Sequence, residues 1–231
     1  MLRGIRCHDD GWTARDAHPQ ITREGKPSAF STELVGKYSA FEEIDLEDYL
    51  AVRDRAVRMM AAEDAYAGLL VSMHTYNLLT VRADRSTIRP EQLPLLDRFL
   101  VEQCSLQREL LGRVRSDAGF SEEEKGDERI RDHFRLLQAA DNLSLLSCVG
   151  YRRPATLLHP LPLRDGSYSE VRVEPLGERH FRLTPYPFGD DPVEFEFPVR
   201  HVEGKLFANA AELQKGFAEA PATRLTVIAT A

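Results

Sequence analysis

The spacing of apolar residues changes once along the chain, near Gly150. Before this residue, apolar side chains recur every three or four positions, which is the period of a helix with one buried face. After it, apolar and charged residues alternate, as they do in strands that bury one face of a sheet. The pattern predicts an α+β protein, with a mostly helical domain over residues 1–150 and a small β-rich region over residues 151–231 that packs on it.

Four stretches of the first part have clear helical signals. One follows Asp45, a favoured N-cap residue, and a second covers residues 66–77. A third is predicted to begin near Pro90, because proline needs no amide partner in a first turn, and to end near Gly119. The segment 121–124, Ser-Glu-Glu-Glu, has the pattern of a capping box and predicts the start of a fourth helix.

The second part is predicted to be mostly strand. Alternation predicts strands at residues 171–173, 181–183, 193–199 and 225–229, with a short helix at residues 209–218. Turn-forming residues at 176–178 and 189–192 separate the first three strands. No internal repeat is visible, so the tail is interpreted as one small sheet rather than an array.

Two aspartates occupy positions in apolar helical stripes. The first stripe is Leu2, Ile5, Asp9 and Trp12, and the second is Ile130, Phe134, Leu137, Asp141, Leu145 and Cys148. A buried carboxylate must be compensated by an arginine, by hydrogen-bond donors or by a metal ion, because burying it unpaired costs several kcal/mol. His8, beside Asp9, favours a metal ion, and an arginine partner is the structural alternative for each acid.

Further side chains near these stripes are candidate donors. His74 lies beside Met73 on the apolar helix over residues 66–77. It ranks second as a ligand, since a lone helical histidine is more often a hydrogen-bonded core residue. Gln138 and Ser144 lie three residues to either side of Asp141, so both are candidate donors of hydrogen bonds to it. Their alternative role is that of ordinary polar residues flanking a helix.

Composition narrows the function classes. A net charge of −7 argues against nucleic-acid binding by phosphate neutralisation, although a few arginines in one pocket suffice for a small phosphorylated ligand. No apolar run approaches the roughly 20 residues of a membrane span, and no signal peptide pattern is present, so a cytoplasmic location is expected. The three cysteines show no CxxC spacing, which leaves histidine and aspartate as the carriers of any chemistry.

Three segments together carry a family resemblance. They are His8-Asp9-Asp10-Gly11-Trp12, Leu70-Val71-Ser72-Met73-His74 and Leu137-Gln138-Ala139-Ala140-Asp141-Asn142-Leu143-Ser144-Leu145. In this order they resemble a bacterial protein family, domain-of-unknown-function family 3891, with HD-like architecture. His8-Asp9 followed far downstream by Asp141 also resembles the H...HD...D signature of the HD-domain phosphohydrolase superfamily. The resemblance covers nearly the whole chain.

The resemblance implies a helical metal site in which His8, Asp9 and Asp141 are ligands. It implies that His74 is a ligand of a second metal ion or a phosphate contact. The ion implied is divalent, and mixed imidazole and carboxylate ligands do not choose among Mn, Fe, Mg, Co and Zn.

The reaction implied is metal-dependent hydrolysis of a small phosphorylated substrate, in which a metal-activated water attacks phosphorus. Asp10 is the candidate base, and Arg6 and Lys26 are candidate phosphate contacts. HD domains take a further histidine from a helix upstream of the HD pair, whereas this chain starts seven residues before His8. Two alternatives therefore stay open: a non-catalytic, degenerate relative that binds a ligand or a partner, and a structural protein whose acids pair with arginine.

Overall fold

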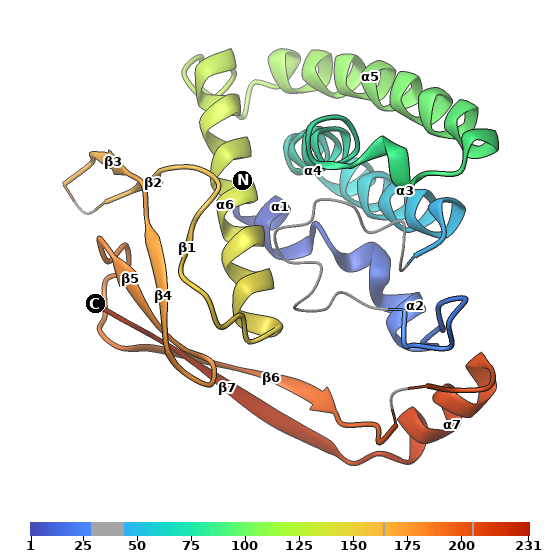
Figure 1. Ribbon diagram of the computed structural model, residues 1–231. Helices are drawn as coiled ribbons and strands as arrows, with labels where there is room; N and C mark the ends of the chain where they lie inside the picture. Colours follow the sequence, from blue (N-terminus) through green and yellow to red (C-terminus); the bar gives the residue numbers. More distant parts are fainter. Residues whose placement is uncertain (29–43, 164, 205) are drawn as a thin grey trace. The chain divides into compact units, whose positions relative to one another are not determined.

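A computed structural model describes residues 1–28, 44–163, 165–204 and 206–231 (Figure 1). Helices dominate its first part and a mixed sheet its second, which confirms the α+β class. The described residues form two compact units. One takes its residues from Met1–His18 and Gly36–Leu137, and the other takes its residues from Pro19–Val35 and Gln138–Ala231.

The helical part contains long helices joined by short helical turns. The α-helices are α1 (Leu2–Cys7), α2 (Thr13–Asp16), α3 (Leu46–Glu63), α4 (Ala65–Asn77), α5 (Leu93–Ser116) and α6 (Asp127–Cys148). The 3-10 turns are η1 (Asp10–Trp12), η3 (Arg85–Thr87) and η4 (Pro90–Gln92), and η2 (Leu78–Arg82) is a π-helical turn directly after α4. The last helix of this series, α6, runs from the first unit into the second.

The helix starts follow from local chemistry. Asp45 caps α3 by accepting a hydrogen bond from the backbone amide of Glu47 at 3.0 Å, as its sequence position predicted. Asp64 separates α3 from α4 and caps the latter through the amide of Ala67. Pro90 opens the short turn η4, and α5 follows directly. These three boundaries are therefore encoded by single residues.

The predicted start of the fourth helix is wrong. Ser121 and Glu124 do form the reciprocal hydrogen bonds of a capping box. Residues 122–125 are nevertheless a turn, and α6 begins only at Asp127. Gly126, whose amide closes the turn on the carbonyl of Glu123, is a poor helix residue, so the helix starts after it.

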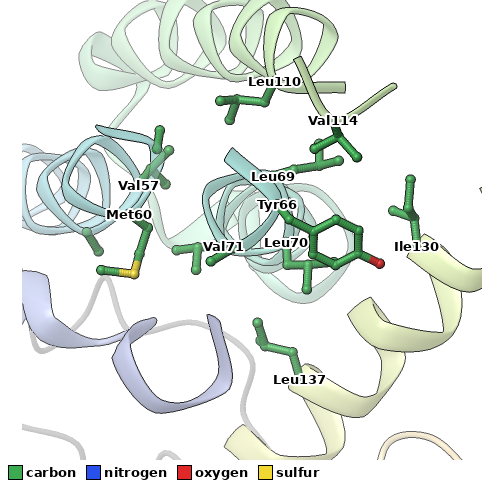
Figure 2. Close-up of a cluster of buried hydrophobic side chains, with 13 residues drawn as sticks. Val57, Met60, Tyr66, Leu69, Leu70, Val71, Leu110, Val114, Ile130 and Leu137 are labelled. Atoms are coloured by element: carbon green, nitrogen blue, oxygen red, sulfur yellow. The ribbon is translucent and has the colours of Figure 1, made fainter. Parts of the chain in front are cut away.

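The main core of the first unit surrounds α4 (Figure 2). Leu70 and Val71 of α4 are 0% and 1% exposed, and Val57 from α3 and Leu110 from α5 are both 0% exposed. Leu137 of α6 also points into this cluster. Because α4 is apolar on most of its surface, it is enclosed by its neighbours rather than lying at the surface.

A five-stranded sheet is the centre of the second unit. Its strands are β1 (Ala155–Thr156), β4 (Arg172–Gly177), β5 (His180–Thr184), β7 (Ala222–Thr230) and β6 (Val193–Arg200), in that order across the sheet. All neighbours are antiparallel except β5 and β7. The predicted strands and the predicted helix, α7 (Ala210–Glu219), are confirmed. Strand β1 and a separate pair, β2 (Leu161–Pro162) and β3 (Tyr168–Ser169), have no counterpart in the prediction.

In the described part of the chain, no helix combines the length and the apolar character that a membrane span requires.

Candidate metal centre

Three of the predicted donors come together. One ligand atom from each of His8, His74 and Asp141 lies within 4.8 Å of the others. They belong to the end of α1, to α4 and to α6, which are far apart in the sequence. Small side-chain rotations bring such atoms within reach of one ion, since metal bonds to nitrogen and oxygen are about 2.0–2.2 Å long.

His8 is held by the turn that ends α1. It is the C-cap residue of the helix and is 8% exposed. Its Nδ1 lies 2.8 Å from the carbonyl oxygen of Ile5, and because a carbonyl only accepts, Nδ1 carries the proton. In the neutral ring, Nε2 therefore has the lone pair, which is the arrangement typical of a metal-ligating histidine whose other nitrogen donates to a backbone carbonyl.

His74 is the most deeply buried member of the cluster, with 1% of its surface exposed. Its ring centroid lies 5.4 Å from that of His8, and the two rings meet edge to face. The two rings come from α1 and α4, which pack on each other, and a Cβ built on Gly4 of α1 would be in ordinary contact with Ala67 of α4. The helix departs from α geometry only a few residues later, at η2, and such π-helical turns are frequent at functional sites.

Asp141 is half-buried and lies one helical turn after Leu137. Leu137 is 0% exposed and belongs to the core around α4. Because α6 is one continuous helix, residues spaced by four positions share a face, so Asp141 is directed to the same side as Leu137. The predicted stripe thus holds from Ile130 to Leu137, whereas its last member, Cys148, is exposed.

The stripe that was predicted to bury Asp9 does not form. The helix ends at Cys7, Asp9 has non-helical dihedral angles, and η1 follows. Leu2 is 68% exposed, and the side chain of Asp9 is 49% exposed. The prediction that Asp9 is buried is wrong because its spacing assumed an unbroken helix from Leu2 to Trp12.

Asp9 is held from two sides. Its Oδ1 accepts a hydrogen bond from Nη1 of Arg53 at 2.7 Å, and its Oδ2 lies 3.4 Å from Nε2 of His8. Partial burial opposes ionisation of Asp9, but Arg53 and the two nearby histidines outweigh it, so the pKa of this carboxyl lies far below its usual range. Asp9 is thus an anion under ordinary conditions and faces the histidine of the cluster.

The remaining candidates for catalysis and phosphate binding lie at the surface. Asp10 is exposed at the start of η1, and Arg6 is exposed in the last turn of α1. Lys26 is exposed and pairs with Glu24 at 3.1 Å. Their roles stay predictions.

The two residues that flank Asp141 differ from each other. Gln138 is 2% exposed, and its Oε1 lies 2.8 Å from Nε2 of His159. Ser144 is exposed. It contacts the thiol of Cys148, whose pKa is raised by burial and lowered in part by Ser144.

Arg53 is the member of this region that the sequence interpretation missed. It is 4% exposed and lies on α3, where Tyr49, Arg53, Val57 and Met60 follow one another at spacings of four, four and three. An arginine within an otherwise apolar stripe is a readable signal, because a buried guanidinium needs an acidic or aromatic partner. The sequence analysis predicted the helix after Asp45 and did not single out this charge on its apolar face.

The fold and the cluster define an α+β protein with a His–His–Asp group on packed helices. The chain belongs to a family described as Protein of unknown function (DUF3891), whose family model matches residues 1–204. The matched range contains all three clustered residues. The chain has no significant match among curated proteins or among solved structures.

Proposed function

We propose that this protein binds one divalent cation through His8, His74 and Asp141 and uses it to hydrolyse a small phosphorylated substrate. The observation that carries the proposal is the convergence of the three donors within 4.8 Å. Two imidazoles and one carboxylate suit Mn, Fe, Co or Zn, and the set does not select one of them.

The surroundings of the donors support a cation. Both imidazoles are buried, and the ring of His8 is oriented by the hydrogen bond that Nδ1 donates to the Ile5 carbonyl. The second imidazole comes from His74, downstream of His8-Asp9, so a histidine from an upstream helix is not needed to complete a two-histidine set. A hydrogen bond such as that of His8 to the Ile5 carbonyl orients a metal ligand and raises the affinity of the site for the ion.

The hydrolytic step rests on the resemblance to the HD-domain phosphohydrolases, which is an analogy of family rather than of geometry. A divalent cation at this site would supply a Lewis acid and lower the pKa of a bound water. Asp10, next to Asp9, is then the candidate base for that water, and Arg6, two residues before His8, is a candidate phosphate contact.

Thermal unfolding tests the cation site. The protein is stripped with chelator, and Tm is measured with Mn²⁺, Fe²⁺, Mg²⁺, Co²⁺ or Zn²⁺ added singly. At least one ion should raise Tm, because a ligand at about 100 times its Kd stabilises the native state by roughly 2.7 kcal/mol. Asp141→Asn should abolish the rise, whereas Asp132→Asn, the same change elsewhere on α6, should retain it.

The stability of Asp141→Asn in chelator separates a metal ligand from an ion pair. A metal ligand can be neutralised without loss, so the variant should be at least as stable as the wild type. A loss of about 3–5 kcal/mol would instead identify an uncompensated arginine partner. A wild type that gains no Tm with any of the five ions contradicts the proposal.

Hydrolysis is tested with p-nitrophenyl phosphate and a panel of small phosphomonoesters in the presence of the stabilising ion. Turnover that disappears in Asp141→Asn and persists in Asp132→Asn supports the phosphohydrolase. Tight ion binding without turnover of any member would overturn the catalytic half and favour the non-catalytic, ligand-binding alternative.

A further inference from the structure

Arg53 lies in an aromatic setting that fixes its orientation. Its Cζ is 5.6 Å from the ring centroid of Trp12 and 5.2 Å from that of Tyr49, and the two rings meet edge to face at 5.8 Å. The guanidinium side chain is 5% exposed. A planar cation against two aromatic rings has few orientations available, so its N–H groups point in defined directions.

The backbone around this cation is also closely packed. A Cβ built on Gly11 would lie 2.2 Å from the carbonyl oxygen of Val52 and 2.9 Å from the amide nitrogen of Ala56. The turn η1 therefore lies directly on the backbone of α3, with Asp9 immediately before it and Arg53 immediately after Val52. Asp9 and Arg53 are thus brought together where these two segments pack on each other.

The two carboxylate oxygens of Asp9 have different neighbours. Oδ1 takes the hydrogen bond from Arg53 at 2.7 Å, which leaves Oδ2 directed to His8, 3.4 Å from Nε2. Two donor atoms bound to one ion at about 2.1 Å are themselves roughly 3.0–3.5 Å apart at ordinary coordination angles. The spacing of Oδ2 and Nε2 falls in that range. Asp9 lies outside the group of three residues whose ligand atoms are all within 4.8 Å of one another, so its side chain must shift towards the other donors when an ion binds.

We propose that Arg53 is a positioning residue for the cation site: by holding Oδ1 of Asp9, it directs Oδ2 beside Nε2 of His8 and so makes Asp9 a fourth donor. This inference rests on the proposed cation site of His8, His74 and Asp141. Arg53 itself does not touch the ion. Its effect passes through Asp9, and the rings of Trp12 and Tyr49 keep it in place.

The direction in which cation affinity changes when Arg53 is removed tests this role, because the positive charge of Arg53 has two opposing effects. A guanidinium near a cation repels it and competes for Asp9, so its removal would tighten binding if electrostatic repulsion dominated. If positioning dominates, its removal frees Asp9 to rotate into solvent and weakens binding. Loss of an outer partner of a metal ligand typically costs about 10- to 100-fold in affinity.

Mn²⁺ and Zn²⁺ are titrated calorimetrically into the full chain. Arg53→Met should weaken binding by about tenfold or more, and Arg53→Lys should recover part of the loss, because it restores one donor without the planar fork. Arg55→Met is the matched control: Arg55 lies on the same helix and contacts the Gly11 carbonyl at 3.3 Å, so its replacement should leave affinity within about twofold.

Asp9→Asn keeps the inference testable if Arg53→Met fails to fold, since the amide oxygen can still accept from Arg53. Asp9→Asn should weaken binding as Arg53→Met does, and the double variant should be no weaker than the weaker single variant. Unchanged or tighter binding in Arg53→Met, or unchanged binding in Asp9→Asn, overturns the positioning role. A wild type that binds neither ion refutes the cation site itself, so the two failures are distinguishable.

Discussion

At the scale of single residues, Tyr66 and His133 form a polar contact in the helical part of the protein. The hydroxyl of Tyr66 is 2.7 Å from Nδ1 of His133, and the ring of Tyr66 stacks on Phe120 with centroids 5.3 Å apart. Burial raises the pKa of Tyr66 to about 12, and burial lowers the pKa of His133. Both shifts favour neutral side chains, which suits a hydroxyl that donates to an imidazole nitrogen.

This contact makes a prediction for alkaline pH. The folded-state pKa of Tyr66, about 12, lies above its ordinary value of 10.0, so its contribution to stability is complete below pH 10 and is lost as pH rises towards 12. Tyr66→Phe should lose about 1 kcal/mol at pH 8 through the missing hydrogen bond. Between pH 10 and 12 the gap should shrink, because the wild type declines more steeply. Urea unfolding of both proteins at a series of pH values measures this difference in the free energy of unfolding. A difference that stays constant as pH rises would contradict the raised pKa of Tyr66.

The candidate site shows what residue patterns can reveal. His8, His74 and Asp141 were all candidates from the sequence, because two lie in or beside apolar stripes and the third is a histidine on an apolar helix. Their ranking rests on periodicity, which describes one helix at a time. The approach of His74 to His8 depends on how α1 packs on α4, which periodicity does not predict.

At the scale of elements, close helix contacts depend on glycines without a Cβ. Gly11 places η1 on the backbone of α3, and Gly68 places α4 on α3, where an added Cβ would lie 2.5 Å from the Cα of Ala61. Gly112 of α5, by contrast, has open space around it. Glycine is less favourable than alanine within a helix. Close packing offsets this cost at Gly11 and Gly68 but not at Gly112.

Two matched substitutions test this account. Gly11→Ala forces the backbone of η1 away from α3 and should destabilise the protein by about 1–3 kcal/mol. Gly112→Ala should stabilise it by up to about 1 kcal/mol, because alanine is the better helix former. Denaturant unfolding gives both values. Equal effects of the two changes would show that the contact of η1 with α3 is not tight.

Element prediction succeeded where one residue decides a boundary and failed where packing decides it. Asp45 and Pro90 mark helix starts in sequence and in structure. The capping box at Ser121 forms, yet Gly126 delays the helix. The helix expected through Asp9 stops at Cys7, and the result is a pair between Asp9 and Arg53 that no periodicity within one segment predicts.

At the scale of the whole molecule, the change from helical to alternating pattern near Gly150 gives the α+β class correctly. The sequence placed a domain boundary at residues 150 and 151, and that boundary stays a prediction. The division into compact units falls within α6, between Leu137 and Gln138. A composition change marks where secondary structure switches, whereas a compact unit is defined by contacts between distant segments, such as Pro19 and Gln214.

The central claim is that His8, His74 and Asp141 bind one divalent cation. Crystals grown with Mn²⁺ and measured on both sides of its absorption edge test it directly. We expect one anomalous peak about 2.0–2.2 Å from an imidazole nitrogen of each histidine and from a carboxylate oxygen of Asp141. A fully occupied Mn²⁺ bound elsewhere, or no peak while the three side chains bond only to protein groups, would contradict it.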